Sequence, residues 1–250
     1  MFLPLHDGVP LQHMKTPVVA RSLIVACVVI HLVFLYGPFS ADEMVGGLGL
    51  IPAVLFGFET LPPGYPFVPV WMTLATNIFL HGSWFHLIGN MLFLWVFGDN
   101  VEDAMGHLRF LAFFLICGIV ASFVHAVASF SMVGVSMPES FILPAPQRPL
   151  IGASGGVSGV VAAYVILYPR VRIWALFLGG IPLRLPAYWA IGFWFAVQFI
   201  SAFFGSDEGV GWFAHLGGFI AGAILIPIMR HRYDPVLARA AATQELQSSR

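Results

Sequence analysis

Long apolar runs dominate this chain, and they restrict it to folds in which every backbone polar group is satisfied away from water. The runs lie at about residues 21–39, 85–98, 108–128, 154–168, 187–204 and 210–229. A bilayer core of ~30 Å is crossed by roughly 20 helical residues. Only 9% of this chain is charged, against about 25% in soluble domains. The sequence therefore predicts an all-α membrane protein, a bundle of six transmembrane helices that forms a single domain over residues 1–250.

Positive charge is distributed unevenly between the two ends of this predicted bundle. With six spans both termini share a side, and that side holds ten of the eleven lysines and arginines: Lys15, Arg21, Arg109, Arg170, Arg172, Arg184, Arg230, Arg232, Arg239 and Arg250. Only Arg148 falls on the other side. Because cytoplasmic loops carry the excess of Lys and Arg, we expect both termini, including the polar tail at 230–250, to be cytoplasmic.

Two outer loops are unusually long. The first, at residues 40–70, is rich in Gly, Pro and Phe, and a loop of this length in a compact protein usually has a structure or function of its own. We therefore expect a structured first loop, followed by an interfacial helix at about 71–80. The third loop, at about 129–153, must lead directly into the fourth span.

The fourth span is too short to cross the bilayer. Ser154 to Tyr168 is 15 residues, or ~22 Å of helix, and the cytoplasmic end is fixed by Pro169 and Arg170. The helix must therefore begin several ångströms below the outer surface, with the preceding loop dipping into the protein. Non-helical backbone at that depth is tolerated only where protein or a water-filled cavity surrounds it. Ser154 is thus predicted at the floor of a wet cavity that is open to the outside.

Three further polar residues reach a similar depth. His215 lies five residues into the sixth span, or ~7 Å below its start. His86 and Asn90 stand near the outer start of the second span, and their i, i+4 spacing puts them on one helix face. A lone serine in a glycine-rich span usually serves packing, so the shared depth of these four residues is what indicates a site.

Small residues allow the fourth and sixth spans to approach each other. Each span carries two glycines four residues apart: Gly155 and Gly159 on the fourth, Gly218 and Gly222 on the sixth. Such pairs let helix backbones pack closely in lipid. We therefore expect close packing that brings Ser154 within hydrogen-bond reach of His215.

These residue types suit acyl transfer. A serine hydroxyl needs an adjacent base to act as a nucleophile, and histidine exchanges protons near neutral pH. The backbone N–H of Ser154, the ring of His86 and the amide of Asn90 are the expected donors to an oxyanion. Because no Asp or Glu lies within any of the six runs, a Ser154–His215 dyad is expected rather than a triad.

Other reactive side chains have simpler interpretations. His31 and His125 are expected to hydrogen-bond a neighbouring helix or to face an interface, and His81 is assigned to the membrane interface. The sequence has no HExxH zinc motif, no nucleotide-binding glycine fingerprint and no pair of aspartates within a span. We therefore expect no metal and no cofactor, and the net charge of −1 gives no reason to expect nucleic acid.

The motifs together resemble the rhomboid family of intramembrane serine proteases, in its bacterial six-span type. GASG at 152–155 matches the family's GxSG, AHLGGFIAG at 214–222 matches AHxxGxxxG, and HLIGN at 86–90 matches HxxxN. The resemblance covers about residues 21–230.

The resemblance implies a role for each matching residue. Ser154 would be the nucleophile, His215 the general base, and His86 with Asn90 part of the oxyanion hole. Gly152 would shape the turn into the serine, Gly155, Gly218 and Gly222 would support the site, and the loop at 205–211 would be a flexible cap. Substrates would be transmembrane proteins cut in or near their spans. The protein would lie in a bacterial inner membrane with its site opening outward, and its oligomeric state is left open.

One position departs from the family, and two other functions stay open. Some members have a tyrosine stacked on the histidine ring one turn after the serine. This chain has Ser158 there, which leaves a nearby Phe or Trp to brace His215. A non-catalytic relative that binds or escorts membrane proteins would need neither Ser154 nor His215. A transporter or channel is disfavoured because the spans lack carboxylates and the two halves of the chain do not match.

Overall fold

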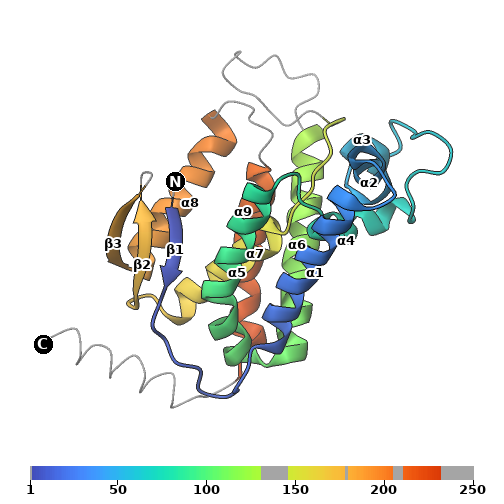
Figure 1. Ribbon diagram of the computed structural model, residues 1–250. Coiled ribbons are helices and arrows are strands. Elements are labelled where there is room, and N and C mark those ends of the chain that lie inside the picture. The colour runs from blue at the N-terminus through green and yellow to red at the C-terminus, as the bar shows by residue number, and fades with distance from the viewer. Residues whose placement is uncertain (1, 131–145, 178–179, 205–210, 232–250) are drawn as a thin grey trace, which may run out of the picture.

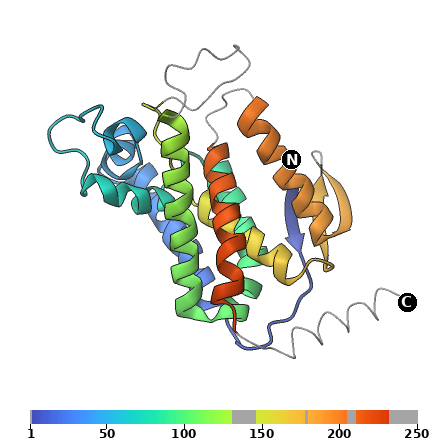
Figure 2. The same cartoon turned by 180° about the vertical axis from the view of Figure 1, so that it is seen from behind.

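The computed structural model describes residues 2–130, 146–177, 180–204 and 211–231. Its helices are α1 Val18–Tyr36, α2 Ala41–Leu48, α3 Pro52–Leu55, α4 Thr73–Thr76, α5 Trp84–Met105, α6 His107–Phe130, α7 Ser154–Leu167, α8 Ala187–Phe204 and α9 Trp212–Met229, with 3-10 turns η1 Val70–Met72 and η2 Asn77–Phe79 and strands β1 Phe2–His6, β2 Arg172–Phe177 and β3 Ile181–Pro186. Helices α1, α5, α6, α7 and α9 form a bundle, with α2, α3 and α4 on one flank and the sheet with α8 on the other (Figure 1). The view from behind shows α6 beside α9 (Figure 2).

Each predicted span corresponds to a helix. Among the described residues, α1, α6 and α9 are long and apolar enough to cross a bilayer, whereas α7 and α8 are apolar but shorter. The largest difference is in α5, which continues to Met105 where the sequence predicted an end near Gly98. The interfacial helix predicted at 71–80 is present as η1, α4 and η2.

The extra turns of α5 carry buried carboxylates that anchor the N-terminal segment. The Asp103 carboxylate accepts the backbone N–H groups of residues 12–14, each at 2.8 Å. The Glu102 carboxylate accepts those of Val19 at 2.9 Å and Ala20 at 2.7 Å. These last two groups belong to the first turn of α1, whose N–H groups have no partner within the helix. The end of α5 therefore caps α1 and orders the chain before it.

A three-stranded antiparallel sheet, in the order β1-β2-β3, was missed by the prediction of an all-α chain. In β2, Ile173 and Ala175 are buried while Arg172 and Trp174 are exposed, which is the period of two expected for a strand. Strands β1 and β3 contain prolines, which sheets accept at their edges. The local sequence does not reveal this sheet, because β1 pairs with a segment that is distant in the chain: Phe2 lies opposite Phe177.

Helix α7 lies at the centre of the bundle, and its backbone packs directly on α9. A Cβ atom placed on Gly218 would overlap the carbonyl oxygen of Gly155, and one placed on Gly222 would overlap that of Gly159. No side chain larger than hydrogen fits at these points. The two small-residue pairs predicted from the sequence therefore face each other, as expected for helices that associate in lipid without a hydrophobic driving force.

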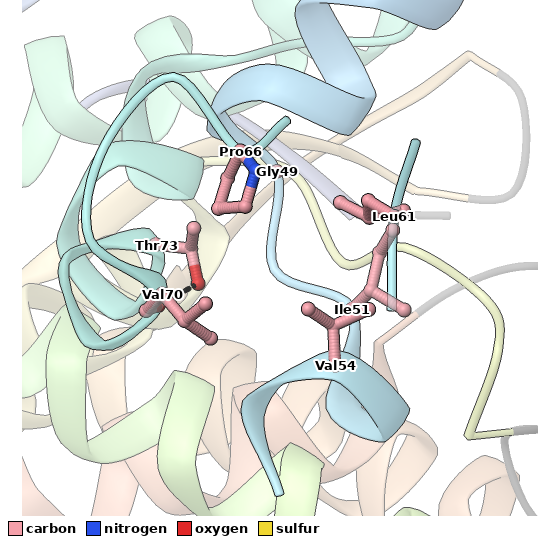
Figure 3. A pocket seen from close by; sticks show the side chains of 7 residues that line it. All are labelled: Gly49, Ile51, Val54, Leu61, Pro66, Val70 and Thr73. Atoms are coloured by element: carbon pink, nitrogen blue, oxygen red, sulfur yellow. Dashed lines mark hydrogen bonds between the residues drawn. The ribbon is translucent and has the colours of Figure 1, made fainter. Parts of the chain in front are cut away.

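The first loop is structured, as predicted. Helix α2 begins with a capping box, in which the Ser40 hydroxyl accepts the Glu43 N–H at 3.2 Å and the Glu43 carboxylate accepts the Ser40 N–H at 2.7 Å. A small apolar cavity lies between Ile51 and Val54 on one side and Val70 and Thr73 on the other (Figure 3). The Thr73 hydroxyl donates to the Val70 carbonyl at 2.6 Å, and no candidate site residue lines this cavity.

Candidate active site

Ser154 is the first residue of α7 and follows a turn at Gly152, where the backbone has a conformation that only glycine adopts easily. Gly152 has a φ of +130°, in the region that residues with a Cβ rarely occupy. Its N–H donates to the Asn77 carbonyl at 2.9 Å. Ala153 is fully buried, whereas Ser154 is half-buried. The turn thus holds the serine at the N-terminus of a buried helix while leaving part of it accessible.

His86 and Asn90 lie against Gly152, so these three predicted residues are brought together. A Cβ atom placed on Gly152 would lie 2.8 Å from His86 Nε2 and 3.8 Å from Asn90 Nδ2. The Ser83 hydroxyl caps α5 by accepting the His86 N–H at 3.1 Å. Asn90 Nδ2 is buried, with no hydrogen-bond partner among the described residues. Because an unpaired buried donor costs about 1–3 kcal/mol, this amide is poised to bond an acceptor that enters the site.

The packing of α7 on α9 puts Ser154 and His215 at the same end of the helix pair. A Cβ atom placed on Gly155 would lie 3.8 Å from the carbonyl oxygen of Ala214. The residue after the serine therefore contacts the residue before the histidine. His215 itself lies in the first turn of α9 and is half-buried.

Two tryptophans and a glutamine surround the His215 ring. Trp194 stacks on the ring with centroids 6.3 Å apart and planes at 28°, and Trp212 approaches edge-on at 5.8 Å and 88°. His215 Nδ1 lies 2.6 Å from Gln198 Oε1. Ser158 does not take part, because its hydroxyl donates to the Ser154 carbonyl at 2.7 Å within α7.

The first loop holds the non-helical backbone that leads into Ser154. Leu50 and Leu150 exchange backbone hydrogen bonds, at 3.1 Å from Leu50 N–H and 2.7 Å from Leu150 N–H. The Ala53 N–H donates to the Pro146 carbonyl at 2.9 Å. At these described positions the backbone before Ser154 finds hydrogen-bond partners in the protein, which is the condition for irregular backbone at membrane depth.

Three other histidines lie inside the protein. His31 and His125 are buried, and among the described residues both ring nitrogens of His31 and Nδ1 of His125 have no hydrogen-bond partner. His81 is fully buried, and its ring centroid lies 5.2 Å from that of His86. His81 therefore borders the candidate site.

Gln198 is the residue at the site that the sequence interpretation missed. Its signal was present, because it is the only amide in the apolar run of α8 and lies four residues after Trp194, on the same helix face. The predicted cap at 205–211 lies outside the described residues except for Gly211, as does the tail beyond 231. Within the described part of the chain, no group of three or more His, Cys, Asp or Glu side chains is arranged to hold a metal ion.

Several curated proteins are similar to this chain. The presenilin-associated rhomboid-like protein, mitochondrial, of Mus musculus is 28% identical over 145 residues, which is 57% of this chain and 35% of that protein. The Rhomboid protein 1, mitochondrial, of Saccharomyces cerevisiae is 26% identical over 207 residues, covering 76% of this chain and 54% of that protein. The matches thus span about a third to half of these relatives. Their names are organellar, so they give no support to a bacterial inner membrane.

The family match covers the whole candidate site. Residues 69–232, more than half of the chain, match the family described as Rhomboid domain, and the match includes His86, Asn90, Ser154 and His215. With helices long and apolar enough to cross a bilayer, the protein is integral to a membrane. The chain therefore belongs to the rhomboid family, whose members are in general intramembrane serine proteases.

Proposed function

We propose that this protein is an intramembrane serine endopeptidase that hydrolyses peptide bonds in or near the transmembrane segments of other membrane proteins. In this proposal Ser154 is the nucleophile and His215 the general base. The observation that carries it is the backbone contact of Gly155 with Gly218, since it brings together the two helix ends that carry the serine and the histidine.

The reaction follows the acyl-enzyme course of serine hydrolases. His215 Nε2 takes the proton of the Ser154 hydroxyl as its Oγ attacks the scissile carbonyl carbon. The imidazolium then gives this proton to the leaving amine, the C–N bond breaks, and an ester to Ser154 remains. Water attacks the ester with His215 again as base, and the carboxylic acid product leaves as Ser154 regains its proton.

Stabilisation of the tetrahedral intermediate falls to donors around Gly152. The buried Asn90 amide has no partner among the described residues, so it gains a hydrogen bond when an oxyanion forms. The His86 ring and the Ser154 backbone N–H are the other donors of this proposed oxyanion hole. Ser154 is also the first residue of α7, where the helix dipole favours negative charge.

The substrate has to unwind before it reacts. In an α-helix each carbonyl is hydrogen-bonded to the N–H four residues on, and the surrounding turns shield it from attack. A transmembrane helix with a locally destabilised turn is therefore the expected substrate class. The chemistry needs no cofactor or metal, and the lipid bilayer is the partner that brings enzyme and substrate together.

We also propose six spans in one domain over residues 1–250, with both termini on the cytoplasmic side and the site opening to the other. In support, the start of α1 and the end of α9 lie at the same end of the bundle (Figure 1). The His231 N–H donates to the Ala104 carbonyl at the end of α5, at 3.0 Å.

Labelling with a fluorophosphonate tests the function directly, because this probe reacts with an activated serine. We expect the purified protein to be labelled and to cleave a transmembrane model substrate. Ser154→Ala should do neither while unfolding at the same temperature. A protein that is folded but neither labelled nor active would instead be a non-catalytic relative, and cleavage at the wild-type rate by Ser154→Ala would remove Ser154 from the mechanism.

A further inference from the structure

Gln198 carries a side-chain amide on α8, a helix whose other side chains are almost all apolar. Helix α8 exposes Trp189, Phe193 and Val197, yet the Gln198 side chain is only 6% exposed. It lies on the inward stripe of this helix, one turn after Trp194 and one turn before Ala202. A buried amide in a membrane helix is costly unless it is hydrogen-bonded, and such residues are commonly functional.

Within the part of the chain that the structure describes, the Gln198 side chain forms a hydrogen bond with the proposed base. Gln198 Oε1 lies 2.6 Å from His215 Nδ1, and an amide oxygen can only accept. Nδ1 must therefore carry the proton in a neutral ring, which leaves the lone pair on Nε2. Only this tautomer can accept a proton at Nε2, and a residue that fixes it does what the carboxylate does in a Ser-His-Asp triad.

We propose that Gln198 is a positioning residue that fixes the tautomer and orientation of His215, so that the site works as Ser154–His215–Gln198. The proposal rests on the proposed function. It also explains why Ser158 is tolerated one turn after the serine. Trp194, on the same face of α8 as Gln198, stacks on the His215 ring, so α8 supplies both the apolar face and the polar contact. A neutral amide achieves this without the larger cost of a carboxylate inside the membrane.

The alternative is that the Gln198 amide only stabilises the packing of α8 on α9. Three variants separate the two roles. Gln198→Met keeps the length of the side chain and removes the acceptor, Gln198→Glu keeps an acceptor and adds charge, and Val197→Ala changes a lipid-facing neighbour. Among the described residues, the other titratable side chains whose charge acts on the His215 ring are His86 and His125, and none of the three variants alters them.

If Gln198 positions the base, Gln198→Met lowers kcat at least tenfold with little change in KM, while Val197→Ala cleaves at the wild-type rate. Gln198→Glu recovers most of kcat. The acid limb of its rate profile moves to higher pH, because the new carboxylate stabilises the imidazolium. Wild-type kcat in Gln198→Met, or an unmoved acid limb in an active Gln198→Glu, overturns the proposal.

A spectroscopic readout keeps this test separate from the test of the protease itself. In protein labelled with ¹⁵N-histidine, the His215 signals are those absent from His215→Asn. The wild type should show a protonated Nδ1, and Gln198→Met a mixture of tautomers. If the wild type neither cleaves nor is labelled, the proposed protease fails, whereas an unchanged tautomer in Gln198→Met defeats the role of Gln198 whether or not the protein cleaves.

Discussion

Replacing Gly218 by alanine should separate the two halves of the proposed dyad. The added methyl group would overlap the carbonyl oxygen of Gly155, which is backbone and cannot turn aside as a flexible side chain can. Non-bonded atoms settle at about 3.5–4.0 Å, so relief of the overlap requires α7 and α9 to move apart by more than about 1 Å at this point. His215 lies one turn before Gly218 on the same helix, and it would move with it.

The expected magnitudes follow from this displacement. Overpacking of a tight contact typically costs about 1–3 kcal/mol, which for a chain of this size lowers the unfolding temperature by roughly 2–4 °C per kcal/mol. A misplacement of about 1 Å between reacting groups costs about 10²-fold in rate. Gly218→Ala should therefore lose far more activity than stability.

The assay is cleavage of a transmembrane model substrate in proteoliposomes, read together with the unfolding temperature. Gly192 provides the matched control, because it is also in a helix and a Cβ atom placed on it meets nothing within 4 Å. Gly192→Ala should keep full activity and gain about 0.4–1 kcal/mol from the reduced freedom of the unfolded chain. A Gly218→Ala protein with the rate and unfolding temperature of the wild type would refute the close backbone contact on which the site depends.

Three further predictions concern single side chains. Asn90→Ala should lower kcat by up to ~10²–10³ with little loss of stability, since its Nδ2 has no partner to lose among the described residues; unchanged turnover would remove Asn90 from the oxyanion hole. Asp103→Ala should destabilise the protein by at least about 1.5–3 kcal/mol and expose residues 12–14 to protease, because it removes the acceptor of three N–H groups; resistance equal to the wild type would contradict that anchor. Burial raises the pKa of Asp7 above its usual 3.8 despite a hydrogen bond from Tyr164, so its contribution to stability is full below about pH 4 and is lost as the pH rises through the raised pKa. Asp7→Asn should therefore flatten this part of the curve of unfolding temperature against pH, and a slope equal to that of the wild type would show that Asp7 is not its source.

The parts that the sequence predicted well are those controlled by local composition. Apolar length alone predicts the helices, because a span must satisfy its own backbone. Helix α7 is short because its apolar run is short, and its packing on α9 follows from glycines at a spacing of four. Depth predicted that His86 and Asn90 would lie near Ser154, and the structure places both against Gly152, two residues before this serine.

The parts that were missed depend on contacts between distant segments. Strand β1 lacks a distinctive pattern and is a strand only because β2 lies beside it. Hydropathy ended the second span near Gly98, yet α5 continues because the carboxylates of Glu102 and Asp103 find backbone donors in the N-terminal segment. Gln198 had no visible partner in the sequence, since its significance depends on which face of α8 meets α9.

Three separate sets of contacts, referred to below as supports, position the candidate site, and they predict which property each kind of substitution should change. Ser154 is placed by α7 against α9, and the Gly152 turn is held by the Asn77 carbonyl of η2 and, through Leu150, by Leu50 of the first loop. The ring of His215 is oriented from α8, by Gln198. Changes in the first loop should therefore weaken stabilisation of the oxyanion without altering the tautomer of His215, whereas changes on the inward face of α8 should do the reverse. Among the described contacts, the glycine contact between α7 and α9 is the one shared by the proposed nucleophile and the proposed base, so damage there cannot be offset by either of the other supports.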